Sequence, residues 1–383
     1  MRRTVCFAVI AAALTTVAVR AQIAIPSTFL ICISASGTGS DCYLPGLSGG
    51  QRYSVTSTLA VERPVTVWGD RGATVTALER DSPFPDLMIS LNVSNSEVYR
   101  MDFYGGGVPP SYSTSAEDVG SGGDNNEIAF CNFYDSPGYS IDSGGSAALI
   151  AYNTSYWAGF LAVRSGGTGA TILGNDIEYG GGDGLILDGY ANNTVTSNYL
   201  YNNTWNYTIF NISGGQMDIE DLVNSVTAST NFFQFDASDV PWTSNCCWTG
   251  GIESHGAYVY LYNNSSAGHT GAGIYFWGGT YADVRGYDPT TQDSGGDSWA
   301  NTYDGVAFTN VSSVNLDDVN SQSNGYYGIR LQPNGTATTV NWSSTYGLTT
   351  YNSLGACAYD TSTGGSITAA SGSAPDPSCT RIY

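Results

Sequence analysis

Lysine is absent from the 383 residues of this chain, and arginine supplies all 12 of its basic residues. Three of these arginines lie within the first 21 residues, so the remainder carries nine arginines against 33 acidic residues, a net charge of −24. This charge disfavours nucleic acid and anionic membrane surfaces as partners. A strongly anionic polysaccharide is also disfavoured, unless calcium bridges it or the few arginines gather in one cleft. A lysine base is excluded as a catalytic group.

Histidine and cysteine are also scarce. The only histidines are His255 and His269, and the seven cysteines after residue 21 show no His/Cys spacing of a metal site. Each end of the chain holds two cysteines close in sequence that could form a disulfide in an oxidising compartment, Cys32 with Cys42 and Cys357 with Cys379. Cys131 is expected to face inward as a small hydrophobe. The adjacent Cys246 and Cys247 are hard to pair without strain.

Long apolar runs are missing except at the start of the chain. Arg2 and Arg3 form a basic start, residues 6–17 are apolar, and Ala-Val-Arg-Ala before Gln22 is similar to an Ala-x-Ala cleavage site. No later stretch is long and apolar enough to span a bilayer. Residues 1–21 are therefore predicted to be a signal peptide, and residues 22–383 to be exported as one elongated domain.

Glycine is abundant, with 48 residues, and it opens short strands at regular intervals. Most intervals are 21 to 25 residues, while one of 44 is interpreted as two periods and one of 32 as a period with an insertion. Such a repeat of short strands indicates a solenoid, in which equivalent residues stack in columns. The predicted opening positions are Gly138, Gly159, Gly184, Tyr207, Gly251, Gly273, Gly305 and Gly328.

The four residues after each opening position alternate in character. The first and third are apolar or small, as in Leu185 and Leu187, and the second and fourth carry nearly all the variation. This alternation predicts that odd positions face inward and even positions form an exposed strip. A second column is predicted to be a stack of structural asparagines in turns, namely Asn132, Asn153, Asn175 and Asn198.

A resemblance to the right-handed parallel β-helix of the pectate-lyase-like superfamily is carried by ATILGNDIEYGGGDGLILDG, NNTVTSNYLYNN and SSVNLDDVNSQSNGYYGIRLQ. The segments YSVTSTLAVERPVTVWGD and LMISLNVSNSEVYRMDFYGG are similar to the first coils of such proteins. The resemblance covers roughly residues 50–355. It implies an all-β, single-stranded right-handed parallel β-helix of about twelve coils, with caps at about 22–50 and 356–383. It does not imply one activity, because this fold hosts lyases, hydrolases, epimerases and non-catalytic adhesins.

The exposed strip gathers reactive groups near its middle. Glu253 and His255 stand two apart on one strand, so both point the same way at roughly 7 Å, which leaves room for a substrate atom between an acid and a base. Tyr275 and Trp277 take the same positions in the next coil and offer flat faces for sugar rings. The predicted catalytic residues are Glu253, His255 and Asp188. The predicted substrate-binding residues are Tyr275, Trp277, Arg330, Asn211, Trp242 and Trp248, with Arg330 orienting an acidic sugar.

Two insertions, residues 235–251 and 278–305, are predicted to wall this patch. His269 is expected in a surface turn. The second insertion is rich in aspartates that could bind calcium through oxygen ligands: Asp283, Asp288, Asp293, Asp297 and Asp304. A solvated acidic loop is the alternative, because the EF-hand pattern is missing, and no metal site is predicted.

Together these features predict an exported protein that binds, and in one interpretation cleaves or modifies, a polysaccharide on one exposed sheet face. Ser254–Gly256 resembles His-Gly motifs of polygalacturonases and alginate epimerases, but the motifs that accompany them in those families are absent. Hydrolase, lyase and epimerase chemistry all stay open, although a lyase would need arginine as its base. The alternative is a non-catalytic cell-surface or adhesion protein in which the repeat is only a scaffold.

Overall fold

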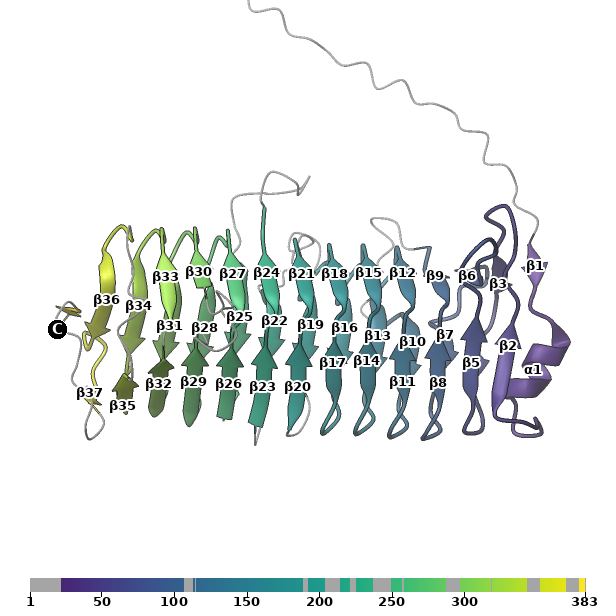
Figure 1. The fold of residues 1–383 in the computed structure, drawn as a ribbon, viewed down its shortest axis with the longest axis horizontal. Helices are drawn as coiled ribbons and strands as arrows, with labels where there is room; N and C mark the ends of the chain where they lie inside the picture. Colours follow the sequence, from purple (N-terminus) through teal and green to yellow (C-terminus); the bar gives the residue numbers. More distant parts are fainter. Residues whose placement is uncertain are drawn as a thin grey trace, which may run out of the picture.

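The chain winds into a right-handed parallel β-helix, seen from the side in the computed structural model (Figure 1). Each full coil contributes one strand to each of three parallel sheets. The structure describes residues 22–106, 113, 115–188, 192–203, 214–220, 225–236, 249–256, 258–286, 297–317, 319–342, 352–369 and 379–382. The predicted signal peptide, Cys246 and Cys247 lie outside these residues. No helix among the described residues is long and apolar enough to cross a membrane.

The three sheets are named here by number, and their strands are given in chain order. Sheet 1 contains β1 (Ile23–Ala24), β3 (Tyr53–Val55), β6 (Ala77–Arg80), β9 (Asp102–Tyr104), β12 (Asn132–Tyr134), β15 (Thr154–Tyr156), β18 (Asp176–Glu178), β21 (Tyr199–Tyr201), β24 (Phe232–Gln234), β27 (Ser265–Ala267), β30 (Asp297–Trp299) and β33 (Asn320–Gln322). Sheet 2 contains β2 (Asp41–Leu44), β5 (Thr66–Gly69), β8 (Glu97–Tyr99), β11 (Glu127–Ala129), β14 (Leu149–Ala151), β17 (Thr171–Leu173), β20 (Asn193–Thr196), β23 (Ser225–Ser229), β26 (Tyr258–Tyr262), β29 (Tyr281–Arg285), β32 (Ser313–Asp317), β35 (Ala337–Trp342) and β37 (Ser366–Ala369). Sheet 3 contains β4 (Leu59–Ala60), β7 (Leu87–Ser90), β10 (Glu117–Ser121), β13 (Tyr139–Ser143), β16 (Val163–Ser165), β19 (Leu185–Leu187), β22 (Gly214–Ile219), β25 (Thr249–Ser254), β28 (Ile274–Trp277), β31 (Val306–Thr309), β34 (Tyr327–Gln332), β36 (Gly355–Asp360) and β38 (Thr380–Ile382).

Both ends of the rod are tied by the disulfides expected from the cysteine spacing. The helix α1 (Ser27–Ile33) lies at the N-terminal end (Figure 1) and buries Phe29 and Ile33 against the first coils. The two bridges join Cys32 to Cys42 and Cys357 to Cys379. Cys131 is buried with a free thiol, as predicted.

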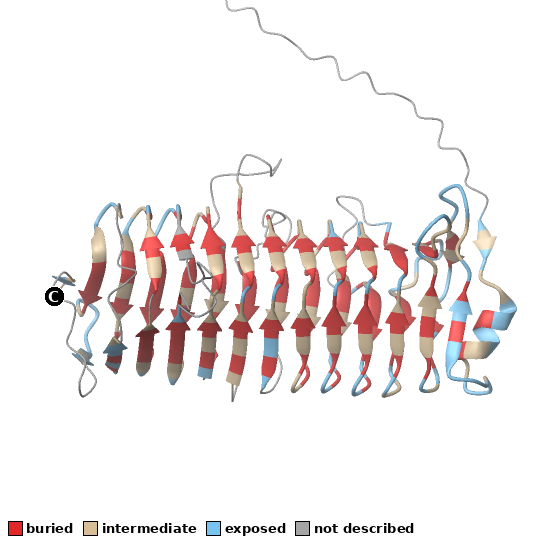
Figure 2. Ribbon diagram, in the orientation of Figure 1, coloured by how far each residue is buried: buried red, intermediate tan, exposed pale blue. Residues whose placement is uncertain are grey.

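The interior is a continuous apolar column enclosed by the three sheets. Leu187 and Phe276 are 0% and 1% exposed, which confirms that the odd positions face inward. Inward residues also stack from coil to coil, as Phe276 does on Phe308 with ring centroids 4.9 Å apart. Figure 2 shows buried residues along every part of the rod, with exposed residues gathered at α1 and in the turns. Because the core fixes the inward positions of every coil, the outward side chains between them also stand in regular columns on each sheet.

Glycine opens the sheet 3 strands in the second half of the rod because a serine hydroxyl takes the space of its side chain. The hydroxyl of Ser266 donates to the carbonyl of Gly273, and Ser298 repeats this contact one coil later. A Cβ atom on Gly251 would lie 2.0 Å from the hydroxyl oxygen of Ser266. Any larger residue would collide there, so these glycines are reliable markers of the strand start.

The predicted register is right at Gly184 and from Gly251 onward, but the predicted alignment is wrong at the strands expected after Gly138, Gly159 and Tyr207. Leu185 pairs with Val163 and with Met217, so the strands on either side open after Ala162 and Gln216 rather than after Gly159 and Tyr207. β13 begins directly after Gly138, as predicted, but Val163 pairs with Ile141, so this strand is aligned two residues further along than predicted. β22 pairs directly with β25, so no coil is missing between them. The turns before these strands vary in length, and Tyr207 itself lies outside the described residues.

The asparagine stack exists, but it begins one residue away from the predicted start. From Asn175 on, each member accepts hydrogen bonds from the backbone N–H and the side-chain amide of its predecessor. Its own side-chain nitrogen donates to a carbonyl of a preceding coil. The stack contains Asn153, Asn175, Asn198, Asn231 and Asn264. Cys131 occupies the first position, since its N–H donates to Asn153. Asn132 instead donates to Asp102 on the outside of sheet 1.

Candidate functional site

The outer face of sheet 3 carries one column of outward residues whose order is fixed by the strand pairing. Neighbours in this column are about 4.8 Å apart, the ordinary spacing of paired strands. From the N-terminal side the column runs Asp142, Arg164, Ile186, Asp218, Glu253, Tyr275, Ala307 and Arg330. Charged and aromatic side chains from distant parts of the chain are thereby placed on one surface.

Three carboxylates cluster at the centre of this column. Asp218 of β22 and Glu253 of β25 are directly paired, and Asp183 lies just before the neighbouring strand β19. Asp183 and Asp218 are only 4% and 6% exposed, while Glu253 is half-buried. Each of the three has one buried oxygen without a hydrogen-bond partner, namely Asp183 Oδ1, Asp218 Oδ1 and Glu253 Oε1. A buried carboxylate oxygen without a donor stabilises the charged form poorly.

Burial, together with repulsion by neighbouring carboxylates, raises the pKa of all three carboxyl groups. For Asp218, burial is the largest cause and the charge of Asp183 adds to it. For Asp183, burial again comes first and Glu253 adds to it, so the pKa lies well above the ordinary range. Burial, assisted by the charge of Glu220, raises the pKa of Glu253 to about 7. The cluster therefore holds protons at neutral pH, where ordinary carboxyl groups are ionised.

No arginine neutralises this cluster, because those on the same face are already paired. Arg164 bridges Asp142 at 3.1 Å and Asp188 at 2.7 Å on the N-terminal side. Arg330 contacts Asp360 at 2.6 Å and Asp304 at 3.8 Å on the C-terminal side. Among the described residues, no ion pair reaches the three clustered carboxylates.

Two aromatic rings follow the cluster in the next coil. Tyr275 pairs with Glu253 across the strands and is half-buried, whereas Trp277 is 51% exposed. Their ring centroids are 5.9 Å apart and the rings are close to perpendicular, at 68°. His255, just after β25, is exposed and lies on the same side of its strand as Glu253. An exposed indole face thus stands beside the protonated carboxylates.

The structure places Glu253, Tyr275 and Trp277 on the consecutive strands β25 and β28 of sheet 3, and His255 follows the end of β25. Asp188 and Arg330 belong to the same face, but Asp188 lies two coils before Glu253 and Arg330 three coils after it, and both are held in the ion pairs described above. Three expected binding residues, Asn211, Trp242 and Trp248, lie outside the described residues.

Sequence analysis missed Asp183, Asp218 and Glu220. The signal for two of them is present in Gly-Gly-Gln-Met-Asp-Ile-Glu, residues 214–220, in which Met217 and Ile219 alternate with the two acids. The strand of this coil was expected after Tyr207 instead, so the alternation in residues 214–220 was not recognised. Asp183 gives no periodic signal, because it lies in the turn before β19.

The two expected insertions do not both border the site. Residues 237–248 lie outside the described part of the chain and connect β24 to β25, the strand of Glu253. The segment 278–305 is not one insertion, because it contains β29 of sheet 2 and β30 of sheet 1. Only residues 286–296 remain between these two strands, and they connect sheet 2 to sheet 1 rather than to sheet 3.

The aspartates considered for calcium are separated by the fold. Asp283 lies in sheet 2, where Arg285 binds it at 2.8 Å, and Asp304 lies near Arg330 before β31. Asp297 belongs to β30 of sheet 1, and residues 288 and 293 are outside the described ranges. Within the described residues, no three His, Cys, Asp or Glu side chains are placed to hold a metal ion.

His269 is a buried residue and not the expected surface residue. Its side chain is fully buried, and neither ring nitrogen has a hydrogen-bond partner. Burial lowers its pKa to about 3, so the ring is neutral. Its backbone N–H donates to Asn301, which begins a second short asparagine stack through Asn324.

Comparison with known proteins supports the fold and gives no activity. No protein-family model matches the chain, and no curated protein matches it. Among solved structures, the chain is similar to the crystal structure of the Dettilon tailspike protein, with a TM-score of 0.51 and 15% sequence identity. The match covers 88% of this chain but 63% of the tailspike chain, so this chain spans less than two thirds of its length. By architecture, the chain is a right-handed parallel β-helix protein.

Proposed function

We propose that this chain is an exported glycoside hydrolase that cleaves a neutral polysaccharide on the outer face of sheet 3. The observation that carries the proposal is the cluster of Asp183, Asp218 and Glu253, whose raised pKa values keep protons available at neutral pH. Glycoside hydrolysis uses a protonated carboxyl group as acid and an ionised one as base or nucleophile. Export is supported by the predicted signal peptide and by the two disulfides.

Glu253 is the proposed proton donor. It is half-buried, so its carboxyl group combines a raised pKa with access from the surface. In hydrolysis it protonates the glycosidic oxygen as the bond to the anomeric carbon breaks. A proton is lost from Glu253 in this step and is recovered from solvent afterwards.

Glu220 is the proposed partner carboxylate. It follows Asp218 by two positions, is exposed, and contributes to the raised pKa of Glu253 through its charge. It takes the proton from the water that attacks the anomeric carbon. The buried Asp183 and Asp218 act as positioning residues, because a hydrogen bond links Asp218 to Glu220 and the Asp183 charge bears on Asp218. The previously expected base, His255, borders the same spot.

A neutral substrate follows from the state of the arginines. A sugar carboxylate needs a free cation, but Arg164 and Arg330 are each shared between two aspartates. Arg330 was expected from the sequence to orient an acidic sugar. Because Arg330 is already paired, the substrate proposed here is uncharged. Lyase chemistry is disfavoured for the same reason. Burial alone would lower the pKa of Arg164, but its bonded carboxylates raise it above the ordinary value, which makes this arginine a poorer base.

The aromatic pair completes the proposed binding surface. Trp277 exposes half of its side chain beside Glu253, and a sugar ring can lie against an exposed indole face through its C–H groups. Acidic and amide groups along sheet 3 then bind hydroxyls. A polysaccharide lying along the column would cross several coils.

Incubation with a glycan panel tests the proposal. The panel contains neutral polysaccharides and polyuronates, and the products are followed by new reducing ends and by the absorbance of unsaturated sugars. We expect reducing ends from a neutral polysaccharide without unsaturated products. Unsaturated products would instead indicate a lyase. Binding without cleavage across the panel would favour the non-catalytic alternative and overturn the hydrolase proposal.

A further inference from the structure

A cavity of about 220 Å³ lies near the N-terminal end of the rod, on the outside of sheet 1. The loop after β2 and the loop between β5 and β6 fold over the strands β6 and β9 there, and they are joined by a bridge between Leu47 and Val75. Leu47, Ala73, Val75 and Ala77 supply apolar wall. The cavity is smaller than the ~300–1,000 Å³ typical of drug-sized ligands, so it suits a smaller molecule.

Polar groups of the same cavity are contributed by sheet 1 and the first loop. Asp102 is 9% exposed and accepts a hydrogen bond from Asn132 at 2.9 Å. Arg71 lies 3.5 Å from its carboxylate. Arg52 lies over the ring of Tyr104, with 3.2 Å between its guanidinium carbon and the ring centroid, and is paired with Glu79 at 3.0 Å. The charged groups at the cavity are thus already paired with one another within the protein.

These contacts decide the chemistry of the ligand. Both arginines are matched by a carboxylate, so the cavity presents no uncompensated charge to attract an ion. Its lining instead combines apolar side chains with hydrogen-bonding groups of Asp102, Gln51 and Arg52. A pyranose has the same division, with C–H groups on its faces and hydroxyl groups around its edge. A carboxylate paired with a guanidinium can bind such hydroxyls without losing its own partner.

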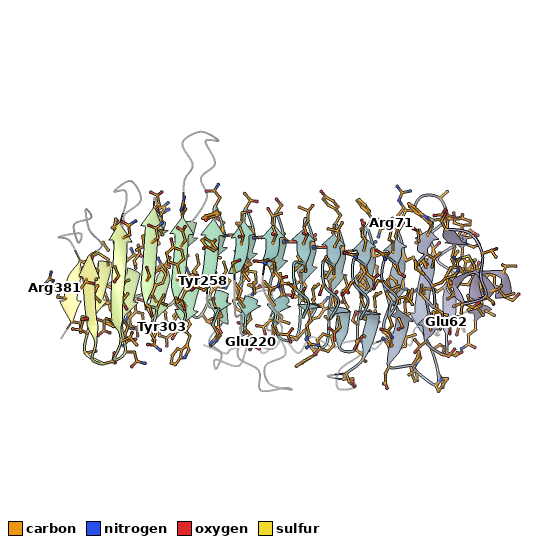
Figure 3. The ribbon with its side chains drawn as sticks, turned by 90° about the horizontal axis from the view of Figure 1, so that it is seen from below. Glu62, Arg71, Glu220, Tyr258, Tyr303 and Arg381 are labelled. Atoms are coloured by element: carbon orange, nitrogen blue, oxygen red, sulfur yellow. A yellow bond between two sulfur atoms is a disulfide. The ribbon has the colours of Figure 1, made fainter. Side chains whose placement is uncertain are left out.

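We propose that this cavity, lined by Gln51, Arg52, Ala73, Asp102 and Tyr104, is a second carbohydrate site that holds one uncharged sugar unit. It is separate from the carboxylate cluster of sheet 3. Five coils lie between β10, which follows β9, and β25, which at about 4.8 Å per coil is about 24 Å along the axis. Figure 3 shows Arg71 and Glu220 on opposite edges of the rod. The site would anchor a glycan chain away from the place of cleavage.

The test titrates the full chain with the methyl glycosides of glucose, galactose, mannose and N-acetylglucosamine at millimolar concentrations, followed by ligand-observed NMR. We expect at least one glycoside to bind. Ala73 is exposed at the cavity, so Ala73→Phe should fill it without unfolding the chain and should weaken binding by about tenfold or more. Asp102→Asn keeps the shape but removes the charge, and should weaken binding by about tenfold.

Two variants serve as controls. Ala60→Phe adds the same side chain at an exposed position of β4 in sheet 3 and should bind the glycoside as the wild type does. Trp277→Ala, which should weaken binding on sheet 3, should leave this binding unchanged. The proposal is overturned if no glycoside binds, if glycine competes as well as the sugars do, or if Ala73→Phe binds normally. Loss of binding in Trp277→Ala would assign the sugar to sheet 3 instead.

Discussion

At the scale of single residues, the carboxyl groups of sheet 3 couple protonation to stability. In the folded chain, the pKa values of Asp183, Asp218 and Glu253 lie above the ordinary carboxyl range near 4. Between that range and the raised values, the folded chain holds protons that the unfolded chain has released. The free energy of unfolding therefore falls as pH rises through this window, because the folded state is the one that binds more protons.

The first prediction concerns Asp218→Asn, which removes one of these protons while keeping the shape. Wild-type protein should lose stability between pH 5 and 8, and the variant should lose clearly less. The variant should accordingly gain in melting temperature relative to wild type at pH 8 and not at pH 5. Thermal unfolding followed by circular dichroism at both pH values measures this. Parallel pH dependence of the two proteins would show that Asp218 is ionised in the folded state.

The second prediction concerns Trp277. Its exposed ring contributes little to the fold, so Trp277→Ala should leave the melting temperature nearly unchanged. If sheet 3 binds a polysaccharide as proposed, this variant should weaken that binding by about 1–3 kcal/mol, the scale for burying a large apolar side chain. Tyr258→Ala is the matched control, because Tyr258 is 40% exposed on sheet 2 and is labelled in Figure 3. Equal losses in affinity titrations of the two variants would remove sheet 3 as the binding face.

At the scale of elements, the asparagine stack connects one coil to the next through buried hydrogen bonds. Asn198 accepts from the backbone N–H of Asn175 at 2.9 Å and donates to the carbonyl of Ile172 at 3.0 Å. It also donates to Asn231. Each amide thus satisfies backbone groups of a turn that the strand ladders leave unpaired, and no water can replace it in the buried corner.

The third prediction is that Asn198→Ala destabilises the fold by about 2–4 kcal/mol, because it leaves more than one buried polar group without a partner. Asn92→Ala removes the same side chain from an exposed position and should cost less than about 0.5 kcal/mol. Chemical denaturation gives both values. A small cost at Asn198 would mean that the stack is not needed to hold the coils together.

The strands themselves could be predicted from sequence, whereas their register could be predicted only in part. Alternation of apolar and variable residues identified the inward Leu187 and Phe276 because the core demands it in every coil. Gly251 marked its strand correctly, since the hydroxyl of Ser266 leaves no room for a side chain. Gly138 also precedes its strand directly, although that strand is aligned two residues further along than expected. Gly159 lies in a turn and did not mark the start of its strand, which begins at Val163.

The same physical reason limits prediction of the site. Glu253, Tyr275 and Trp277 lie in coils joined by regular turns, and their shared face could be inferred from spacing. Asp218 lies after a turn of different length, so its place beside Glu253 depends on tertiary pairing that spacing does not encode. The ion pairs that occupy Arg330 were unpredictable for the same reason, because Asp360 lies 30 positions further along the chain.

At the scale of the whole molecule, the chain is a rod with a single continuous core. The fourth prediction follows from the 13 strands of sheet 3, which at about 4.8 Å per step give a rod near 60 Å long before the end segments are added. Small-angle X-ray scattering should give the asymmetric distance distribution of an elongated particle. A symmetric distribution typical of a sphere would be incompatible with a continuous solenoid.

The central claim is that Glu253 supplies the proton for glycosidic cleavage, and the most direct test is the turnover of Glu253→Gln on the polysaccharide that the wild type cleaves. Glutamine keeps the shape of the side chain but cannot donate this proton, so kcat should fall by about a thousandfold while Kd stays within about threefold. Glu62→Gln, at an exposed position near the N-terminal end in Figure 3, is the matched control and should retain full activity. Wild-type kcat in Glu253→Gln would contradict the account.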